Sequence, residues 1–230
     1  MNVLYLTPVF PAGSNHRYNA STFAAVDPLL GGNDALVRLA GAVSELGMRI
    51  IGDLTTNHSG DGHPWFRAVM GDPSAAERSF YYVGADGRYA SWLGHKSLLR
   101  FDLYSAKLRE RMFGTADSVI SRWLGEPFNL DGCRLDLANR TGRQGVQGDG
   151  AAVAKHIRDT LKVVRPQSVL MAEHTNDFTG DLRGDGWQSS MNYAGFERPI
   201  WCGSPPRCCS PTRERRWCSP ARTGAAGRHR

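Results

Sequence analysis

Four short apolar stretches alternate with helical patterns, and polar side chains gather at the carboxyl ends of the last three. The stretches cover residues 3–9, 48–54, 132–137 and 168–173. Near-continuous apolar strands that alternate with helices are typical of a parallel sheet with helices packed on it. The sequence therefore predicts an α/β fold for residues 1–200.

Three helices are predicted between these strands. Residues 35–46 (ALVRLAGAVSEL) repeat apolar side chains at helical spacing, and Gly47 follows where a left-handed cap is common. Residues 105–124 and 151–164 have the same periodicity. These segments supply the helices that a parallel sheet needs between its strands.

Residues 59–100 break the alternation of strand and helix. The segment is rich in glycine, aromatic residues and histidine, and it lies between a strand and the helix that should follow it. It is interpreted as an inserted subdomain. Three histidines in or before it, His16, His63 and His95, are interpreted as surface or loop residues.

The last thirty residues differ from the rest of the chain. The formal net charge of +6 comes entirely from seven arginines and one glutamate in residues 201–230, which leaves 21 basic and 21 acidic side chains in residues 1–200. The tail contains no Val, Ile, Leu, Met, Phe or Tyr, so we expect it to be disordered. Such an abrupt change is typical of translation in another reading frame. The neutral balance of residues 1–200 argues against a nucleic-acid partner.

Four of the five cysteines lie in this tail. The adjacent pair Cys208 and Cys209 and the absence of a Cys-x-x-Cys spacing argue against a zinc site. No apolar run approaches the 18 or so residues of a membrane-spanning helix. The N-terminus lacks a basic region, and prolines interrupt its apolar stretch, so no signal peptide and a cytoplasmic location are expected.

Three carboxylates lie at or near the carboxyl ends of the predicted strands: Asp53, Asp136 and Glu173. In an α/β barrel these strand ends meet at one mouth. Arg134 lies two residues before Asp136, so both side chains face the same side of the strand, where Arg134 should keep Asp136 ionised. Hydrolysis of a glycosidic bond requires such a pair of carboxyl groups.

These motifs resemble the ordered sequence regions of the α-amylase clan, glycoside hydrolase family 13. Residues 53–58 (DLTTNH) resemble its D-x-x-x-N-H region, residues 132–139 (GCRLDLAN) resemble its G-x-R-x-D region, and Glu173 in MAEHTND resembles the third. Residues 6–32 and 191–193 resemble the neopullulanase and cyclomaltodextrinase branch. Four matches in the right order carry the resemblance.

The resemblance implies a role for each matching residue. Asp136 would be the catalytic nucleophile and Glu173 the general acid and base. Arg134 would hold Asp136, His58 would bind the sugar at the cleaved position, and Tyr18 would stack on that sugar.

Two further residues match positions that support the site, and two others depart from the family pattern. Asp53 and Asn57 match residues that brace the site and the inserted subdomain. Arg140 stands where relatives often have an acidic residue, and Asn19 replaces a frequent Asp. No cofactor is required, no metal ligands are assigned, and a calcium ion near Asn57 is compatible with the resemblance.

The implied fold is an incomplete (β/α)₈ TIM barrel. Residues 3–9 correspond to the second strand of the family and residues 191–193 to the sixth, with residues 59–100 inserted after the third. A complete barrel takes roughly 250 residues. The fourth family region, with its His-Asp pair, has no counterpart, because residues 201–230 stand in its place.

The resemblance implies a retaining α-glucan or α-glucoside hydrolase that acts on α-glucans or maltooligosaccharides through a covalent intermediate. A transglycosylase or isomerase, such as trehalose synthase, is an alternative because it uses the same intermediate. A truncated remnant that at most binds maltooligosaccharides is another, and we expect the isolated chain to show no more than trace hydrolysis. The sequence does not set the oligomeric state.

Overall fold

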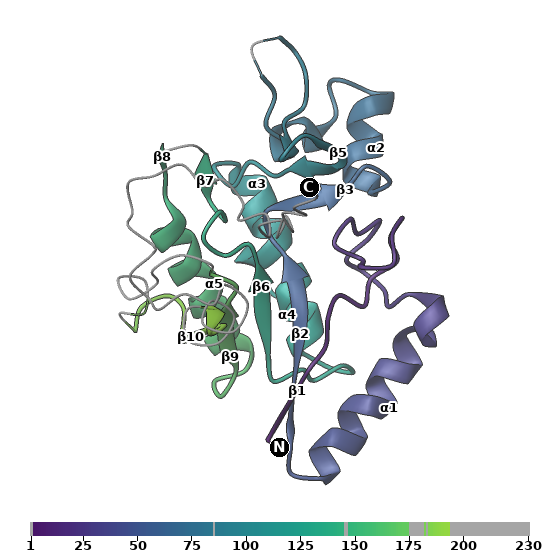
Figure 1. Cartoon of the computed structure of the whole chain (residues 1–230), viewed down its shortest axis with the longest axis vertical. Helices are drawn as coiled ribbons and strands as arrows, with labels where there is room; N and C mark the ends of the chain where they lie inside the picture. The colour runs from purple at the N-terminus through teal and green to yellow at the C-terminus, as the bar shows by residue number, and fades with distance from the viewer. Residues whose placement is uncertain (1, 85, 145–146, 175–181, 183, 194–230) are drawn as a thin grey trace, which may run out of the picture. The chain divides into compact units, whose positions relative to one another are not determined.

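Five parallel strands form the main sheet of the computed structural model, which describes residues 2–84, 86–144, 147–174, 182 and 184–193 (Figure 1). The strands are β1 (Val3–Tyr5), β2 (Arg49–Thr55), β6 (Gly132–Asp136), β9 (Val169–Ala172) and β10 (Ser189–Ser190). The order of the strands across the sheet is β1-β2-β6-β9-β10. The predicted parallel α/β sheet is therefore confirmed.

The first and last strands differ in extent from the sequence prediction. β1 ends at Tyr5 and not at residue 9, since Pro8 and Pro11 have no amide hydrogen to donate to a ladder. β10 lies just before the predicted residues 191–193, and the backbone N–H of Met191 still bonds to the carbonyl of Ala172 at 3.0 Å.

Two of the three predicted helices form almost as expected. These are α1 (Gly32–Glu45) and α5 (Gly150–Val164). The predicted helix over residues 105–124 is instead interrupted. It consists of α3 (Ala106–Arg109), a π-helical turn, η3 (Glu110–Gly114), and α4 (Val119–Leu124).

The interruption has a local cause. Thr115 is extended, with φ −134° and ψ 167°, directly after Gly114. The Ser118 hydroxyl then accepts a hydrogen bond from the backbone N–H of Ser121, so it caps a new helix. Glycine, an extended residue and a serine cap outweigh the apolar periodicity of this segment.

The insertion between β2 and α3 has a small antiparallel sheet of its own, in the order β3-β5-β4. Its elements are β3 (His58–Gly60), α2 (Pro64–Gly71), the 3₁₀ turns of η2 (Ala76–Phe80), β4 (Ser91–Trp92) and β5 (His95–Arg100). Elsewhere, η1 (Pro28–Leu30) precedes α1, and β7 (Arg143–Gln144) pairs with β8 (Gln147–Gly148).

His63 was predicted to be a surface or loop residue; it lies in the bend before α2, but its side chain is buried and not on the surface. Its Nδ1 accepts a hydrogen bond from the N–H of Trp65 at 3.2 Å, so it caps the start of α2. Its ring lies 5.0 Å from that of Phe23 and 4.6 Å from that of Trp65. Burial lowers the pKa of His63 to about 4, so this histidine is a neutral packing and capping residue.

The alternation of side chains along the strands separates the core from the polar face of the sheet. One set of positions packs into the main hydrophobic core with α1, α4 and α5: Ile50, Leu54, Cys133, Leu135, Leu170 and Ala172. The intervening positions in β2 and β6 carry Asp53, Arg134 and Asp136, all buried. Because successive side chains point to opposite faces, the packing of one face fixes the charged groups of the other.

Asp131 ties together the amino ends of three strands. Its carboxylate accepts from the N–H of Ile50 at 2.9 Å and from Arg165 at 2.8 Å. Its backbone bonds to the carbonyl of Ile50 and to the N–H of Val169. These contacts hold β2, β6 and β9 in one register, so their carboxyl ends stop at one level.

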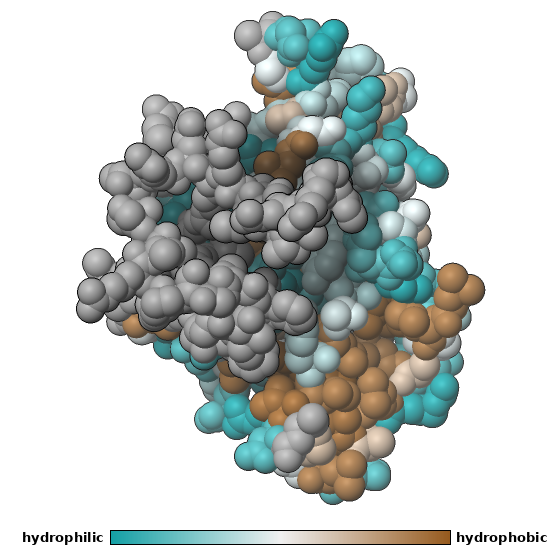
Figure 2. Space-filling model, viewed as in Figure 1, coloured by the Kyte–Doolittle hydropathy of each residue, from teal (hydrophilic) through white to brown (hydrophobic). Residues whose placement is uncertain are grey.

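Apolar side chains also gather on the outside of β1 and α1, as Figure 2 shows in brown. Val3, Leu39 and Leu46 are among the exposed residues there. Within the described part of the chain, β1 pairs only with β2, so its other edge has unpaired backbone groups.

No helix among the described residues is long and apolar enough to cross a membrane.

Replacing Gly132 with alanine should destabilise the sheet strongly. Gly132 has φ +156°, and a Cβ there would lie 2.1 Å from the carbonyl oxygen of Val169 in the adjacent strand. Only a shift of the central strands relieves this clash, so we expect Gly132→Ala to lower the free energy of unfolding by about 3 kcal/mol or more. Urea denaturation followed by circular dichroism measures it.

Gly41→Ala is the matched control. Gly41 lies on the exposed side of α1, and a Cβ there would meet nothing within 4 Å. The same change should stabilise the chain by about 0.5–1 kcal/mol. Equal effects of the two substitutions would contradict the assigned β6–β9 register.

Candidate active site

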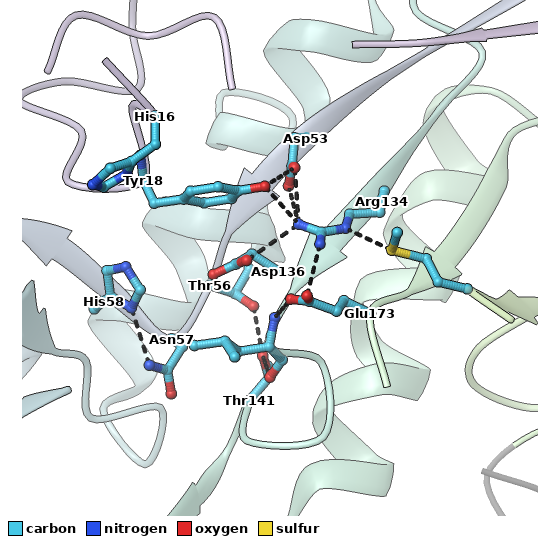
Figure 3. A network of polar contacts seen from close by, with 12 residues as sticks. His16, Tyr18, Asp53, Thr56, Asn57, His58, Arg134, Asp136, Thr141 and Glu173 are labelled. Atoms are coloured by element: carbon cyan, nitrogen blue, oxygen red, sulfur yellow. Dashed lines mark hydrogen bonds and ion pairs between the residues drawn. The ribbon is translucent and has the colours of Figure 1, made fainter. Parts of the chain in front are cut away.

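The strand register brings the three predicted carboxylates together at the carboxyl ends of β2, β6 and β9. Asp53 is paired with Arg134 in the ladder, and Thr55 with Asp136. Glu173 directly follows β9, where its N–H donates to the carbonyl of Leu135 at 2.9 Å. Figure 3 shows the side chains of Asp53, Asp136 and Glu173 converging on Arg134.

One guanidinium group contacts all three carboxylates. Nη1 of Arg134 lies 2.9 and 2.8 Å from the two oxygens of Asp53 and 3.2 Å from Oδ1 of Asp136. Nη2 lies 3.1 Å from Oε1 of Glu173. Burial disfavours the charge of Arg134, but the carboxylates of Asp53 and Glu173 outweigh it and raise the pKa of Arg134. The guanidinium is therefore permanently charged and fixed on several sides.

Asp53 anchors this guanidinium and is itself held by two phenols. The hydroxyls of Tyr5 and Tyr18 donate to its Oδ2 at 2.5 and 3.0 Å. Burial raises the pKa of Asp53, whereas Arg134 and the two phenols act in the opposite direction. Asp53 therefore contacts Arg134, Tyr5 and Tyr18 at once, and the bracing role that the resemblance implies for it stays a prediction.

Tyr5 was not identified by the sequence interpretation. It lies in β1, where its ladder partner is Ile51, so it shares a face with Ile51 and with Asp53 two residues later. A hydroxyl-bearing residue inside the apolar run VLYL was the available signal. Its significance depends on the β1–β2 register, which only the structure supplies.

Asp136 and Glu173 form a coupled pair of carboxyl groups. Glu173 Oε2 accepts the backbone N–H of Leu137 at 2.9 Å, while its other oxygen contacts Arg134. Burial, followed by the charge and hydrogen bond of Glu173, raises the pKa of Asp136 to about 8. The expectation that Arg134 keeps Asp136 ionised is corrected here, because these effects outweigh the guanidinium. Burial and Glu173 thus favour the protonated form of Asp136 in the free site.

Tyr18 and His58 lie on the same side of this pair (Figure 3). The Tyr18 ring is 5.9 Å from the Arg134 guanidinium carbon, in addition to its hydrogen bond to Asp53. His58 is buried, and its Nδ1 lies 3.1 Å from Nδ2 of Asn57. Burial lowers the pKa of His58 to about 4, so this imidazole is neutral at pH 7.

Asn57 and Thr56 connect the strand end to its surroundings. The Asn57 carbonyl accepts the N–H of Phe101 at 3.0 Å, which joins the end of β2 to the insertion. Thr56 Oγ1 lies 2.8 Å from Oγ1 of Thr141 in the turn after β6. These contacts brace the loops that follow β2 and β6.

The structure leaves the predictions about metal ions untested. In the described ranges no group of three or more His, Cys, Asp or Glu side chains is placed to share one ion. Calcium also binds carbonyl and amide oxygens, so the calcium ion near Asn57 stays a prediction. The cysteine-rich tail, residues 201–230, lies outside the described residues.

Comparison with known proteins yields a consistent set of relatives. The family described as "Alpha amylase, catalytic domain" matches residues 1–179. Amylopullulanase from Thermoanaerobacterium saccharolyticum is 27% identical over 217 residues, covering 84% of this chain and 16% of the relative. Cyclomaltodextrinase from Geobacillus thermopakistaniensis is 28% identical over 205 residues, covering 83% of this chain and 32% of the relative. The chain thus spans less than a third of these two curated relatives.

Solved structures agree with the sequence matches. The type III pullulan hydrolase from Thermococcus kodakarensis superposes with a TM-score of 0.74 at 27% identity, covering 84% of this chain and 33% of that one. Ttha1563 from Thermus thermophilus gives 0.73 at 29% identity, covering 84% and 40%. The predicted incomplete barrel is confirmed. With most of its length matched by that catalytic domain, the chain belongs to the α-amylase family of glycoside hydrolases.

Proposed function

We propose that this chain carries the nucleophile and the acid/base of a retaining α-glucan hydrolase of the neopullulanase and cyclomaltodextrinase type. The observation that carries the proposal is that Asp136 and Glu173 share one guanidinium, that of Arg134, at the ends of adjacent strands. A retaining glycosidase needs two carboxyl groups close enough to act on one anomeric carbon from opposite sides of the scissile bond.

In the first step, Asp136 attacks the anomeric carbon while Glu173 protonates the departing glycosidic oxygen. The C–O bond to the leaving sugar breaks, and an ester to Asp136 forms. In the second step, Glu173 takes a proton from water, whose oxygen displaces Asp136 from the same carbon. The first step needs Asp136 ionised and Glu173 protonated, and the second step needs Glu173 ionised.

The substrate class rests on the relatives and on two side chains of the site. The relatives are named for amylopullulanase, cyclomaltodextrinase and pullulan hydrolase activities. We propose that an α-glucan or maltooligosaccharide binds with Tyr18 against one sugar face and with His58 donating to a sugar hydroxyl. A neutral imidazole suits this role, because it bonds to a hydroxyl without adding charge beside Arg134.

A fluorinated maltosyl fluoride should trap the covalent intermediate on Asp136. Fluoride leaves without protonation, and the second fluorine slows the hydrolysis of the ester, so one turnover suffices for detection. Trypsin cleaves after Arg134 and Arg140 and releases LDLANR, whose only carboxyl side chain is Asp136. Mass spectrometry should find the maltosyl group on this peptide.

Two variants make this test specific. Asp136→Asn should give no labelled peptide, whereas Glu173→Gln should accumulate more label, since the base that activates water is gone. A label on another peptide, or none from folded wild type and Glu173→Gln, contradicts the proposed nucleophile. If labelling succeeds, the chain lengths of the products from maltotriose, pullulan and cyclodextrin separate hydrolysis from transglycosylation, and their anomeric configuration tests retention.

The raised pKa of Asp136 should make this residue increasingly unfavourable for the folded chain as the pH rises. The pKa of Asp136 is about 8 in the fold and about 3.9 when unfolded. Between these values Asp136 holds a proton in the folded chain and releases it on unfolding. The contribution of Asp136 to the free energy of unfolding should therefore fall with pH, by on the order of 1 kcal/mol per pH unit at mid-window. His58 and His63, whose pKa values are lowered to about 4, act in the opposite direction below about pH 6.5, so a comparison with a variant isolates the contribution of Asp136.

Urea denaturation of wild type and of Asp136→Asn between about pH 5 and pH 8 measures this contribution. The substituted side chain cannot titrate, so Asp136→Asn should gain stability relative to wild type toward pH 8. Asp159→Asn removes an exposed carboxylate on α5 and is the charge-matched control. A wild-type slope that Asp136→Asn leaves unchanged would show that Asp136 does not hold a proton in the fold.

A further inference from the structure

Tyr5 contacts two residues of the site, although no sequence motif assigned it a role there. Its hydroxyl donates to Oδ2 of Asp53 at 2.5 Å, and its ring lies 6.0 Å from the guanidinium carbon of Arg134. It therefore touches both partners of the ion pair that orients Asp136 and Glu173. Its contacts with Asp53 and Arg134 connect it to those two carboxylates.

Strand pairing holds the backbone of Tyr5, whereas Tyr18, the second phenol of the site, lies outside the helices and strands. Tyr5 is the last residue of β1 and is held in the ladder opposite Ile51, with the next N–H, that of Leu6, bonded to the Ile51 carbonyl at 3.0 Å. Tyr18 lies in the long connection between β1 and η1. If Tyr18 turns toward a bound sugar, Tyr5 is the donor that stays on Asp53.

We propose that Tyr5 is a positioning residue, which holds Asp53 so that Arg134 presents Nη1 to Asp136 and Nη2 to Glu173. The inference rests on the proposed function of that carboxylate pair. Without the Tyr5 hydroxyl, the Asp53 carboxylate keeps its contacts with Tyr18 and Arg134 but loses the donor that belongs to a paired strand. Asp53 then holds the guanidinium less firmly in the orientation that serves Asp136 and Glu173.

The pKa of Asp53 reports this hydrogen bond directly. Burial raises that pKa, and the hydrogen bond from Tyr5 is one of the contacts that lower it. Burial and the Asp53 charge in turn raise the pKa of Tyr5 above the ordinary range of tyrosine. Loss of the hydroxyl should therefore move the titration of Asp53 upward, by about one pH unit for one hydrogen bond to a charged group.

The test is a carbon-13 NMR titration of the Asp carboxyl groups in the whole chain, with Asp53 assigned by Asp53→Asn. Tyr5→Phe should raise the pKa of Asp53 by about one pH unit. Tyr81→Phe is the matched control, because it also removes a buried phenol hydroxyl, bonded to Ser59 at 2.9 Å in the insertion. It should leave Asp53 unchanged. An unchanged Asp53 in folded Tyr5→Phe overturns the proposal.

A measurement on the wild-type chain covers the case in which Tyr5→Phe does not fold. The phenol carbon of Tyr5 should not titrate near pH 10, the ordinary pKa of tyrosine, and titration there overturns the proposal. The rate of maltosyl labelling supplies the catalytic readout. Tyr5→Phe should slow it about tenfold at saturating donor with little change in apparent affinity.

The outcomes separate the two claims. A shifted Asp53 pKa without any labelling of wild type supports the contact but contradicts the proposed glycosidase function, and with it the positioning role. Labelling that is normal in both wild type and Tyr5→Phe supports the function and overturns the role of Tyr5. A slower rate with a shifted Asp53 supports both.

Discussion

The buried guanidinium of Arg134 is the group on which the polar face of this sheet depends. Isolated buried charges are costly, and this cation is compensated by Asp53, Asp136 and Glu173 together. Without it, the charges that these carboxyl groups carry would repel one another. The arrangement requires β2, β6 and β9 in one register. Any change in the pairing of these strands would therefore also separate the charged groups of the site.

The core and the site are opposite faces of the same strands. Leu135 packs among the helices, while Arg134 and Asp136 on either side of it face the carboxylate cluster. At the other end of the sheet, Asp131 and Arg165 fix the strand starts. A shift of one residue in β6 would bury the charges in the core and expose the leucine to the site. Hydrophobic packing thus positions the catalytic candidates.

Much of this could be predicted from sequence because the informative features are local. Apolar runs gave the parallel strands, and the two-residue spacing of Arg134 and Asp136 predicted their shared face. Tyr5 could not be recognised, since its role depends on a pairing between segments 48 residues apart. The protonation of Asp136 depends on burial and on Glu173, which no spacing reveals. The burial of His63 was missed because it depends on packing against Phe23 and Trp65. The break in the helix predicted over residues 105–124 was missed because a local cap outweighs the apolar periodicity.

A double-mutant cycle on Arg134 and Asp53 tests this account most directly. Arg134→Met leaves Asp53 buried without its cation and should lower the free energy of unfolding at pH 7 by about 3 kcal/mol or more. Adding Asp53→Asn removes the uncompensated charge, so the double variant should regain at least about 1 kcal/mol relative to Arg134→Met. Losses that simply add, measured by urea denaturation, would contradict the claim that one guanidinium holds the carboxylate cluster together.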